Sequence, residues 1–132
     1  QLSLPEMKIG MIPGSGGSVR LSRMIGLSRV KDMIMRGKRI SGEEAYNYGL
    51  ASEVVEINDL ESATKNLVKE LCLVSPLAQR AIKTVLNASQ DAPLHVAIEL
   101  EGETYGRLRS SSDFKEGVKS FVEKRKPVYT GQ

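Results

Sequence analysis

The amino-acid sequence predicts an α/β protein in which a few short strands occur early and helices make up most of the chain. Glycine-rich loops and short apolar runs alternate up to Val55, whereas residues 56–132 show helical spacing of apolar side chains throughout. The 132 residues, of which 40% are hydrophobic and 27% charged, suffice for one modest core. We therefore divide the chain into a mixed part, residues 1–55, and a helical part, residues 56–132.

Residues 1–55 are expected to contain short strands at Leu2–Leu4, Ile9–Ile12 and Leu50–Val55. The loop from Pro13 to Gly17 should lead into a helix that begins near Ser18, because proline and glycine favour such an entry.

Two further helices are predicted in this part by their capping residues. Ser28 is a suitable N-cap for a helix through Arg36. Ser41 and Glu44 have the spacing of a capping box, and the helix that they begin should end at Gly49.

The helical part is predicted to hold four helices. Their expected starting signals are Asn58 as an N-cap, Ser75 followed by Pro76, Pro93, and a last helix from about Asp113 that Pro127 ends.

Composition limits the possible partners. The net charge of +3 is mild, and acids alternate with bases except near Glu123–Pro127, which fits a solvated helix end. Because no aromatic residues interleave with those cations, we expect no nucleic-acid partner. No apolar run reaches the length of a membrane span, so we expect no membrane partner.

Cys72 and His95 are the single cysteine and the single histidine. They allow neither an internal disulfide nor a conventional zinc site, so we predict no metal. A Cys-His catalytic pair is formally possible, although no flanking motif supports it. One cysteine fits a reducing compartment, and we expect the cytoplasm or an organelle matrix.

The glycine-rich loop "PGSGG" raises the question of a phosphate site. It lacks the lysine of a Walker loop and the spacing of a dinucleotide fingerprint. A plain turn before a helix is one interpretation. Another is that free N–H groups at the helix start hold a small polar ligand such as a water molecule.

Glu6 follows Pro5 and lies among apolar residues. It could be an ordinary loop glutamate, or a carboxylate placed for proton transfer. The residues alone fit both interpretations.

Three ordered motifs resemble the crotonase (enoyl-CoA hydratase/isomerase) superfamily. They are "LPEMKIGMIPGSGGSVRLSRMIG", "GKRISGEEAYNYGLASEVV" and "EGVKSFVEKRKPVYTG", and together they cover nearly the whole chain. The resemblance implies the crotonase fold, a β-β-α spiral, of which this chain would be the C-terminal, mostly helical half. Residues 1–55 would then end the core and carry part of the active site, and residues 56–132 would form the helical oligomerisation domain.

The resemblance also implies a chemistry on acyl-CoA thioesters without a separate cofactor. Glu6 falls at the second catalytic glutamate of the hydratases, and Gly14 at a glycine whose N–H helps to hold the reacting water. Phe121 and Lys124 would reach the coenzyme A bound in a neighbouring subunit of a trimer or a dimer of trimers. Lysine suits that role because the coenzyme A phosphates are anionic.

The departures from the family pattern, at Ser15, Ser18 and Ser52, touch no catalytic role. The family's oxyanion hole and first catalytic glutamate lie before this segment, and the chain begins with Gln1. We therefore expect a piece of a longer enoyl-CoA hydratase, inactive when isolated. The alternatives are an enoyl-CoA isomerase and a non-catalytic oligomerisation module.

Overall fold

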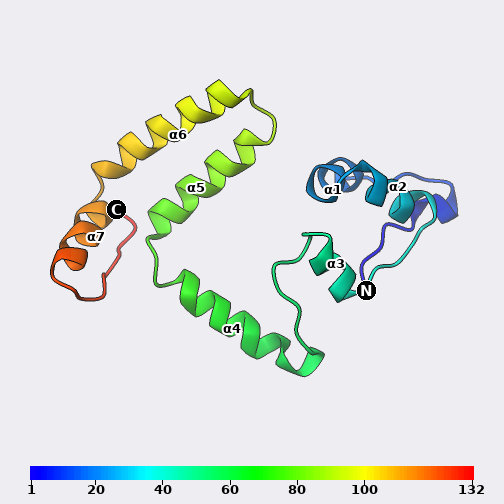
Figure 1. Cartoon of the computed structure of the whole chain (residues 1–132), viewed down its shortest axis with the longest axis horizontal. Coiled ribbons are helices and arrows are strands. Elements are labelled where there is room, and N and C mark those ends of the chain that lie inside the picture. The colour runs from blue at the N-terminus through cyan, green and yellow to red at the C-terminus, as the bar shows by residue number, and fades with distance from the viewer. The chain divides into compact units, whose positions relative to one another are not determined.

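The computed structural model describes residues 1–132, which fold as two compact units, Gln1–Leu60 and Glu61–Gln132 (Figure 1). In chain order the elements are η1 (Glu6–Ile9), α1 (Gly17–Ile25), α2 (Leu27–Met35), α3 (Gly42–Asn47), η2 (Ile57–Asp59), α4 (Leu60–Leu71), α5 (Pro76–Ser89), α6 (Leu94–Arg109) and α7 (Ser112–Val122), where η marks a 3-10 helix. None of these helices has both the length and the apolar character needed to cross a membrane.

The first unit is built around a small core between α1, α2 and α3. Its buried members are Ile25, Val30, Met33, Ile34, Ile40 and Ala45. Leu4 and Leu21 pack against this core from the N-terminal segment and from α1. The packing of Leu4 holds the chain in place two residues before Glu6.

The predicted strands at Leu2–Leu4, Ile9–Ile12 and Leu50–Val55 are wrong. The backbone forms only an isolated antiparallel bridge, in which Leu2 and Ile40 exchange two N–H···O bonds of 2.9 Å. A strand needs a neighbouring segment that pairs with several of its N–H and C=O groups in succession, and beyond the pair of Leu2 and Ile40 these segments have none.

Local bonds replace the missing ladders. Gly10, at φ 75°, closes the 3-10 turn η1 where the second strand was expected to begin. The amides of Leu50 and Ala51 both donate to the carbonyl oxygen of Ala45, at 2.8 and 3.2 Å, and so cap α3.

Two predicted helix starts are confirmed by their hydrogen bonds. At α3 the Ser41 hydroxyl accepts from the Glu44 amide at 3.0 Å, and the Glu44 carboxylate accepts from the Ser41 amide at 2.9 Å. At α5 the Ser75 hydroxyl accepts from the amide of Ala78 at 3.1 Å, with Pro76 in the first turn.

Three predicted helix boundaries are wrong. Gly26, rather than Ser28, is the N-cap of α2, because α1 and α2 meet at this single glycine, whose φ of 84° is positive. Asn58 lies inside η2, which leads directly into α4. The last helix ends at Val122, well before Pro127, because the backbone at Lys124 turns left-handed.

The second unit consists of long helices with little shared interior. α5 and α6 run side by side as a hairpin, and α7 follows α6 (Figure 1). Few of its residues are buried, namely Val85, Thr104, Asp113 and Ser120. Large apolar side chains on all four helices remain exposed, for example Leu67, Leu86, Ile98 and Phe121. Apolar exposure on this scale is typical of surfaces that another polypeptide covers.

Candidate functional site

Glu6 begins η1 and is held there by the backbone on both sides. The Lys8 amide donates to the Pro5 carbonyl oxygen at 2.9 Å, and the Met11 amide donates to the Glu6 carbonyl oxygen at 3.1 Å. The Glu6 side chain is half-buried, and its Oε2 atom is buried with no hydrogen-bond partner. A buried carboxylate oxygen without a donor is costly, so it calls for a ligand, a water molecule or another polypeptide.

Ser3 shares this property with Glu6. Its Oγ atom is also buried without a partner, and no other side-chain nitrogen or oxygen atom of the chain is in that state. Ser3 lines a cavity of about 280 Å³ together with Leu2, Leu4, Gly17, Arg20, Leu21, Met24, Met33 and Leu50. Ser3 could not be predicted from the sequence, because a lone serine beside leucines has no motif of its own.

The glycine-rich loop is a tight turn before α1. Ser15 and Gly16 are both left-handed, at φ 55° and 79°, and the Gly17 amide donates to the Gly14 carbonyl oxygen at 3.1 Å. The guanidinium of Arg20 reaches back from α1 and donates to the Ser15 carbonyl oxygen at 2.7 Å. This bond fixes the turn from the helix side.

Gly14 lies at the exposed front of that turn. A Cβ atom added to Gly14 would meet no atom within 4 Å. Its carbonyl oxygen is used by Gly17, whereas its N–H has no acceptor in the chain. The residue thus offers a backbone donor that has no acceptor in the chain, and such a donor can hold a water molecule.

The segments that carry Glu6 and Gly14 converge at Gly17. A Cβ atom on Gly17 would lie 3.6 Å from a methyl group of Leu4 and 3.8 Å from Cβ of Pro13. Leu4 precedes Glu6 by two residues, and Pro13 directly precedes Gly14. Both Leu4 and Pro13 thus lie close to Gly17, which brings near one another the two segments on which the predicted water site depends.

Phe121 and Lys124 lie at the C-terminal end of α7. The Lys124 amide donates to the Phe121 carbonyl oxygen at 3.2 Å, and the Arg125 amide donates to the Ser120 carbonyl oxygen at 3.0 Å. This bond pair is a Schellman motif, with Lys124 at φ 53° in the position that glycine usually takes. The Phe121 ring is 85% exposed, and Lys124 is also exposed and forms no ion pair.

An ion pair that the sequence interpretation missed joins the two sides of this cap. The Arg125 guanidinium donates from both terminal nitrogens to the two carboxylate oxygens of Glu116, with Nη2 to Oε2 at 2.8 Å. Glu116 also accepts from the Val128 amide at 2.9 Å. Arg125, and then the Val128 amide, lower the pKa of Glu116 to about 2. Glu116 and then Glu123 raise the pKa of Arg125.

The C-terminal tail folds back onto the start of α7. Buried Asp113 accepts from the Ser75 hydroxyl at 2.6 Å and from the amides of Thr130 and Gly131 at 2.8 and 3.1 Å. These bonds, the one from Ser75 first, lower the pKa of Asp113. The carboxylate thus fixes the tail to α5 and α7.

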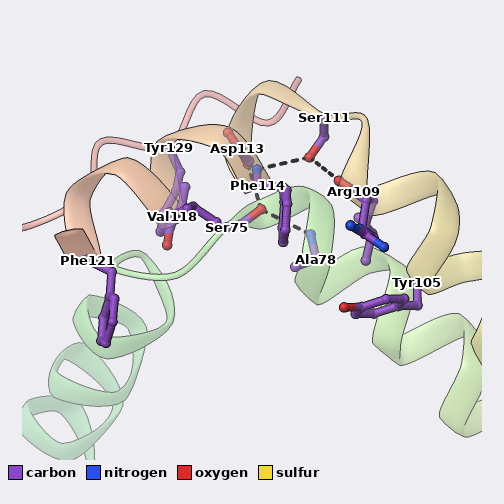
Figure 2. Close-up of a pocket in the computed structure, with 12 residues that line it drawn as sticks. Ser75, Ala78, Tyr105, Arg109, Ser111, Asp113, Phe114, Val118, Phe121 and Tyr129 are labelled. Carbon is purple, nitrogen blue, oxygen red and sulfur yellow. Dashed lines mark hydrogen bonds between the residues drawn. The ribbon is translucent and has the colours of Figure 1, made fainter.

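Beside Asp113, a cavity of about 440 Å³ opens between α6 and α7, with Phe121 and Tyr105 at opposite ends of its lining (Figure 2). Its lining is largely apolar side chain. The four predicted site residues therefore form two pairs: Glu6 and Gly14 in the first unit, and Phe121 and Lys124 in the second.

These features define a chain with a carboxylate and a glycine turn in one unit and an exposed aromatic and cationic cap in the other. The family model described as "Enoyl-CoA hydratase/isomerase" matches residues 1–132. The chain belongs to this family, the crotonase superfamily, whose members act on acyl-CoA substrates.

Individual relatives agree with this placement. Methylglutaconyl-CoA hydratase 1, mitochondrial, of Pyricularia oryzae is 39% identical over 99% of this chain and 42% of its own length. The short-chain-enoyl-CoA hydratase of Clostridium acetobutylicum is 33% identical over 92% of this chain and 47% of its own length.

A solved structure extends the likeness to the fold. The crystal structure of an enoyl-CoA hydratase from Bacillus anthracis superimposes with a TM-score of 0.93, at 35% identity, over 97% of this chain and 50% of that one. The predicted crotonase fold is thus confirmed as a match to half of the solved chain, whereas the predicted strands are not. The chain spans about half the length of the relatives that it matches.

Proposed function

We propose that this chain forms the second half of an enoyl-CoA hydratase, which adds water across the 2,3 double bond of an enoyl-CoA thioester. Glu6 serves as one of the two carboxylates that move protons to and from the reacting water. The other carboxylate and the oxyanion hole, which stabilises the enolate-like intermediate, come from the half that the relatives have in addition.

The observation that carries this proposal is the unpartnered Oε2 of Glu6. Every backbone group around Glu6 that closes η1 is hydrogen-bonded, yet one oxygen of the side chain is buried with no donor. A glutamate with a purely structural role would have its oxygens bonded within the chain, as Glu44 and Glu116 do. The Glu6 carboxylate therefore has one acceptor oxygen available for a hydrogen-bond donor from outside this chain.

Gly14 supplies the complementary donor. Its N–H has no acceptor in the chain, and its segment lies near that of Glu6 beside Gly17. A water molecule between them would donate to the carboxylate and accept from the N–H. Both interactions are needed to orient a water molecule for attack on carbon.

Phe121 and Lys124 are proposed to contact the coenzyme A moiety bound by a neighbouring subunit. Both side chains are exposed, and Lys124 has no acidic partner. The Phe121 ring can stack on the adenine ring of coenzyme A, and the Lys124 ammonium can pair with its phosphates.

The exposed apolar faces of α4 to α7 support the proposed role of residues 56–132 in oligomerisation. We propose a trimer or a dimer of trimers, in which these faces are covered by other subunits or by the remainder of the fold. The proposed location is the cytoplasm or an organelle matrix; the relative from Pyricularia oryzae is named as mitochondrial.

An enoyl-CoA isomerase is the second candidate, since one carboxylate at the Glu6 position can shuttle a proton by itself. The relative from Mycosarcoma maydis, 33% identical to this chain, is named an isomerase/hydratase. A non-catalytic oligomerisation module is disfavoured because Glu6 and the glycine turn are both intact. Nucleic-acid binding is disfavoured because Arg125 is already paired with Glu116 and Glu123.

The test is the substitution Glu6→Gln in the full-length enzyme that carries these residues, assayed with crotonyl-CoA. We expect kcat to fall by about 100-fold or more, the usual contribution of a general acid or base. Exposed Glu53, changed to Gln, is the matched control and should keep wild-type turnover. Unchanged kcat in Glu6→Gln would remove Glu6 from the mechanism.

The isolated 132-residue chain provides a second check. It should show no hydratase activity, because it lacks the oxyanion hole and the first carboxylate of the family's site. Robust turnover by the isolated chain would contradict the proposal that the site is divided between two halves.

A further inference from the structure

Two residues other than glycine adopt a left-handed backbone in this chain, and both belong to the predicted site segments. They are Ser15, next to Gly14, and Lys124 itself, at φ 55° and 53°. An L-residue with a side chain disfavours this region, so its surroundings must hold it there. Such outliers gather at functional positions, and the means of holding them is therefore part of the site.

An arginine side chain is hydrogen-bonded at or next to each of the two. At the glycine turn, Arg20 donates to the carbonyl oxygen of Ser15 at 2.7 Å. At the cap, Arg125 donates from Nε to the Glu123 carboxylate at 2.6 Å and from Nη1 to the Lys126 carbonyl oxygen at 3.1 Å. Arg125 therefore binds the side chain of the residue before Lys124 and the backbone two residues after it.

Glu116 fixes this arginine to the body of α7. It receives both terminal nitrogens of Arg125 in a bidentate ion pair, whose planar geometry sets the direction of the guanidinium. It also accepts from the Val128 amide at 2.9 Å, beyond Pro127. The segment from Glu123 to Val128 is thus closed around Lys124 by one carboxylate and one guanidinium.

We propose that Glu116 and Arg125 are positioning residues for coenzyme A binding, which hold the Lys124 backbone left-handed so that its ammonium group faces the phosphates. This proposal rests on the proposed function of Lys124. Arg125 donates its hydrogen bonds to groups of this chain, whereas adjacent Lys124 is exposed and forms no ion pair. The two neighbouring cations therefore have different roles: Arg125 stabilises the C-terminal cap of α7, and Lys124 contacts the coenzyme A phosphates.

Glu116→Gln gives the sharpest test, because simple electrostatics and positioning predict opposite results. Removing a negative charge near the cap should strengthen the binding of anionic coenzyme A if charge alone matters. If positioning matters, Glu116→Gln should weaken binding, because the bidentate pair with Arg125 is lost.

The experiment measures kcat and KM of the full-length enzyme with crotonyl-CoA and with crotonyl-pantetheine, which lacks the nucleotide and all phosphates. Lys124→Ala should raise KM for crotonyl-CoA on the order of tenfold, as loss of one charge-assisted contact would, with kcat little changed. Glu116→Gln and Arg125→Gln should do the same. None of the three should alter kcat/KM for crotonyl-pantetheine.

A double substitution distinguishes positioning from direct contact. Arg125→Gln combined with Lys124→Ala should raise KM no further than Lys124→Ala alone, because Arg125 acts through Lys124. An additive rise would assign Arg125 its own phosphate contact and overturn the proposal. Arg36→Gln is the matched control, since Arg36 forms an exposed ion pair with Asp32 on α2, and it should leave both substrates unaffected.

The remaining outcomes separate the two proposals. If Lys124→Ala leaves KM for crotonyl-CoA unchanged, the proposed role of Lys124 fails, and the positioning role fails with it. If Lys124→Ala raises KM but Glu116→Gln lowers it or leaves it unchanged, only the positioning role fails. An equal loss of kcat/KM with both substrates would show that the Glu116–Arg125 pair has only a structural role, and would overturn the proposal. Arg125→Lys keeps the positive charge but cannot form the bidentate pair with Glu116. It replaces Arg125→Gln in the comparison if Arg125→Gln does not fold.

Discussion

Leu4 and Pro13 meet at Gly17, where each lies within 4 Å of the position that a Cβ atom would occupy. Leu4 also packs against the core of the first unit. The segment that carries Glu6 and the glycine turn therefore both lie close to the first residue of α1. Only Gly16 is required by the turn, because of its positive φ, whereas the space at Gly17 would admit a Cβ atom in ordinary contact with Leu4 and Pro13.

Gly16 and Gly17 should respond differently to alanine. Gly16→Ala should destabilise the enzyme by about 1–2 kcal/mol, the usual cost of a left-handed L-residue, because Gly16 has φ 79°. Its Cβ atom would also lie 3.2 Å from the Arg20 guanidinium. Gly17→Ala should be neutral or stabilising by less than about 1 kcal/mol, since its new contacts are ordinary and the unfolded chain loses freedom. Urea unfolding of the two variants checks this, and an equal cost at both positions would contradict the role assigned to the turn.

Lys124 should be a position where stability and ligand binding conflict. Lys124→Gly should stabilise the fold by about 1 kcal/mol, because glycine adopts the left-handed cap without the steric cost that a Cβ atom brings. Lys124→Ala keeps that cost and should leave stability nearly unchanged. Both variants should lose the same affinity for coenzyme A thioesters.

Thermal unfolding and isothermal titration with coenzyme A, carried out on the full-length enzyme, measure the two properties separately. If Lys124→Gly proved less stable than Lys124→Ala, the left-handed cap would not be a source of strain.

The sequence predicted features whose cause is local. The capping box of Ser41 and Glu44 and the N-cap at Ser75 formed as expected, since each depends on groups within three residues. The strands failed because pairing needs a second segment, and the backbone of Leu50 found a bond to Ala45 instead. Strand patterns in a chain that matches half of its relatives are therefore weaker evidence than helix caps.

The candidate site likewise combines features that the sequence predicted with features that only the structure shows. Glu6, Gly14, Phe121 and Lys124 were found by resemblance to family motifs, and the structure adds how each is presented. The left-handed conformation of Lys124 could not be predicted from residue preference, because lysine is not a residue that favours it. Nor could the unpartnered oxygen of Glu6, which follows from burial rather than from any pattern in the chain.

The free energy of unfolding should fall in acid, because protonation of Glu116 breaks its ion pair with Arg125. The pKa of Glu116 is lowered from 4.5 to about 2 by Arg125 and the Val128 amide. A lowered pKa means that the folded state favours the carboxylate. The stabilisation is therefore fully present above the unfolded-state pKa of 4.5 and is lost as the pH falls from there toward 2. Glu116→Gln should remove this part of the pH dependence.

The measurement is the free energy of unfolding of wild type and Glu116→Gln at steps between pH 7 and the lowest pH at which both variants fold. The difference between the two should be constant at neutral pH and should shrink in acid, because protonated Glu116 no longer pairs with Arg125. Asp113 and Glu44, whose pKa values are also lowered, contribute equally to both variants and cancel. Glu61→Gln, which removes an exposed pair with Lys65 on α4, is the control and should show no such change. A difference that stays constant throughout the acid range would mean that the pair does not hold the cap.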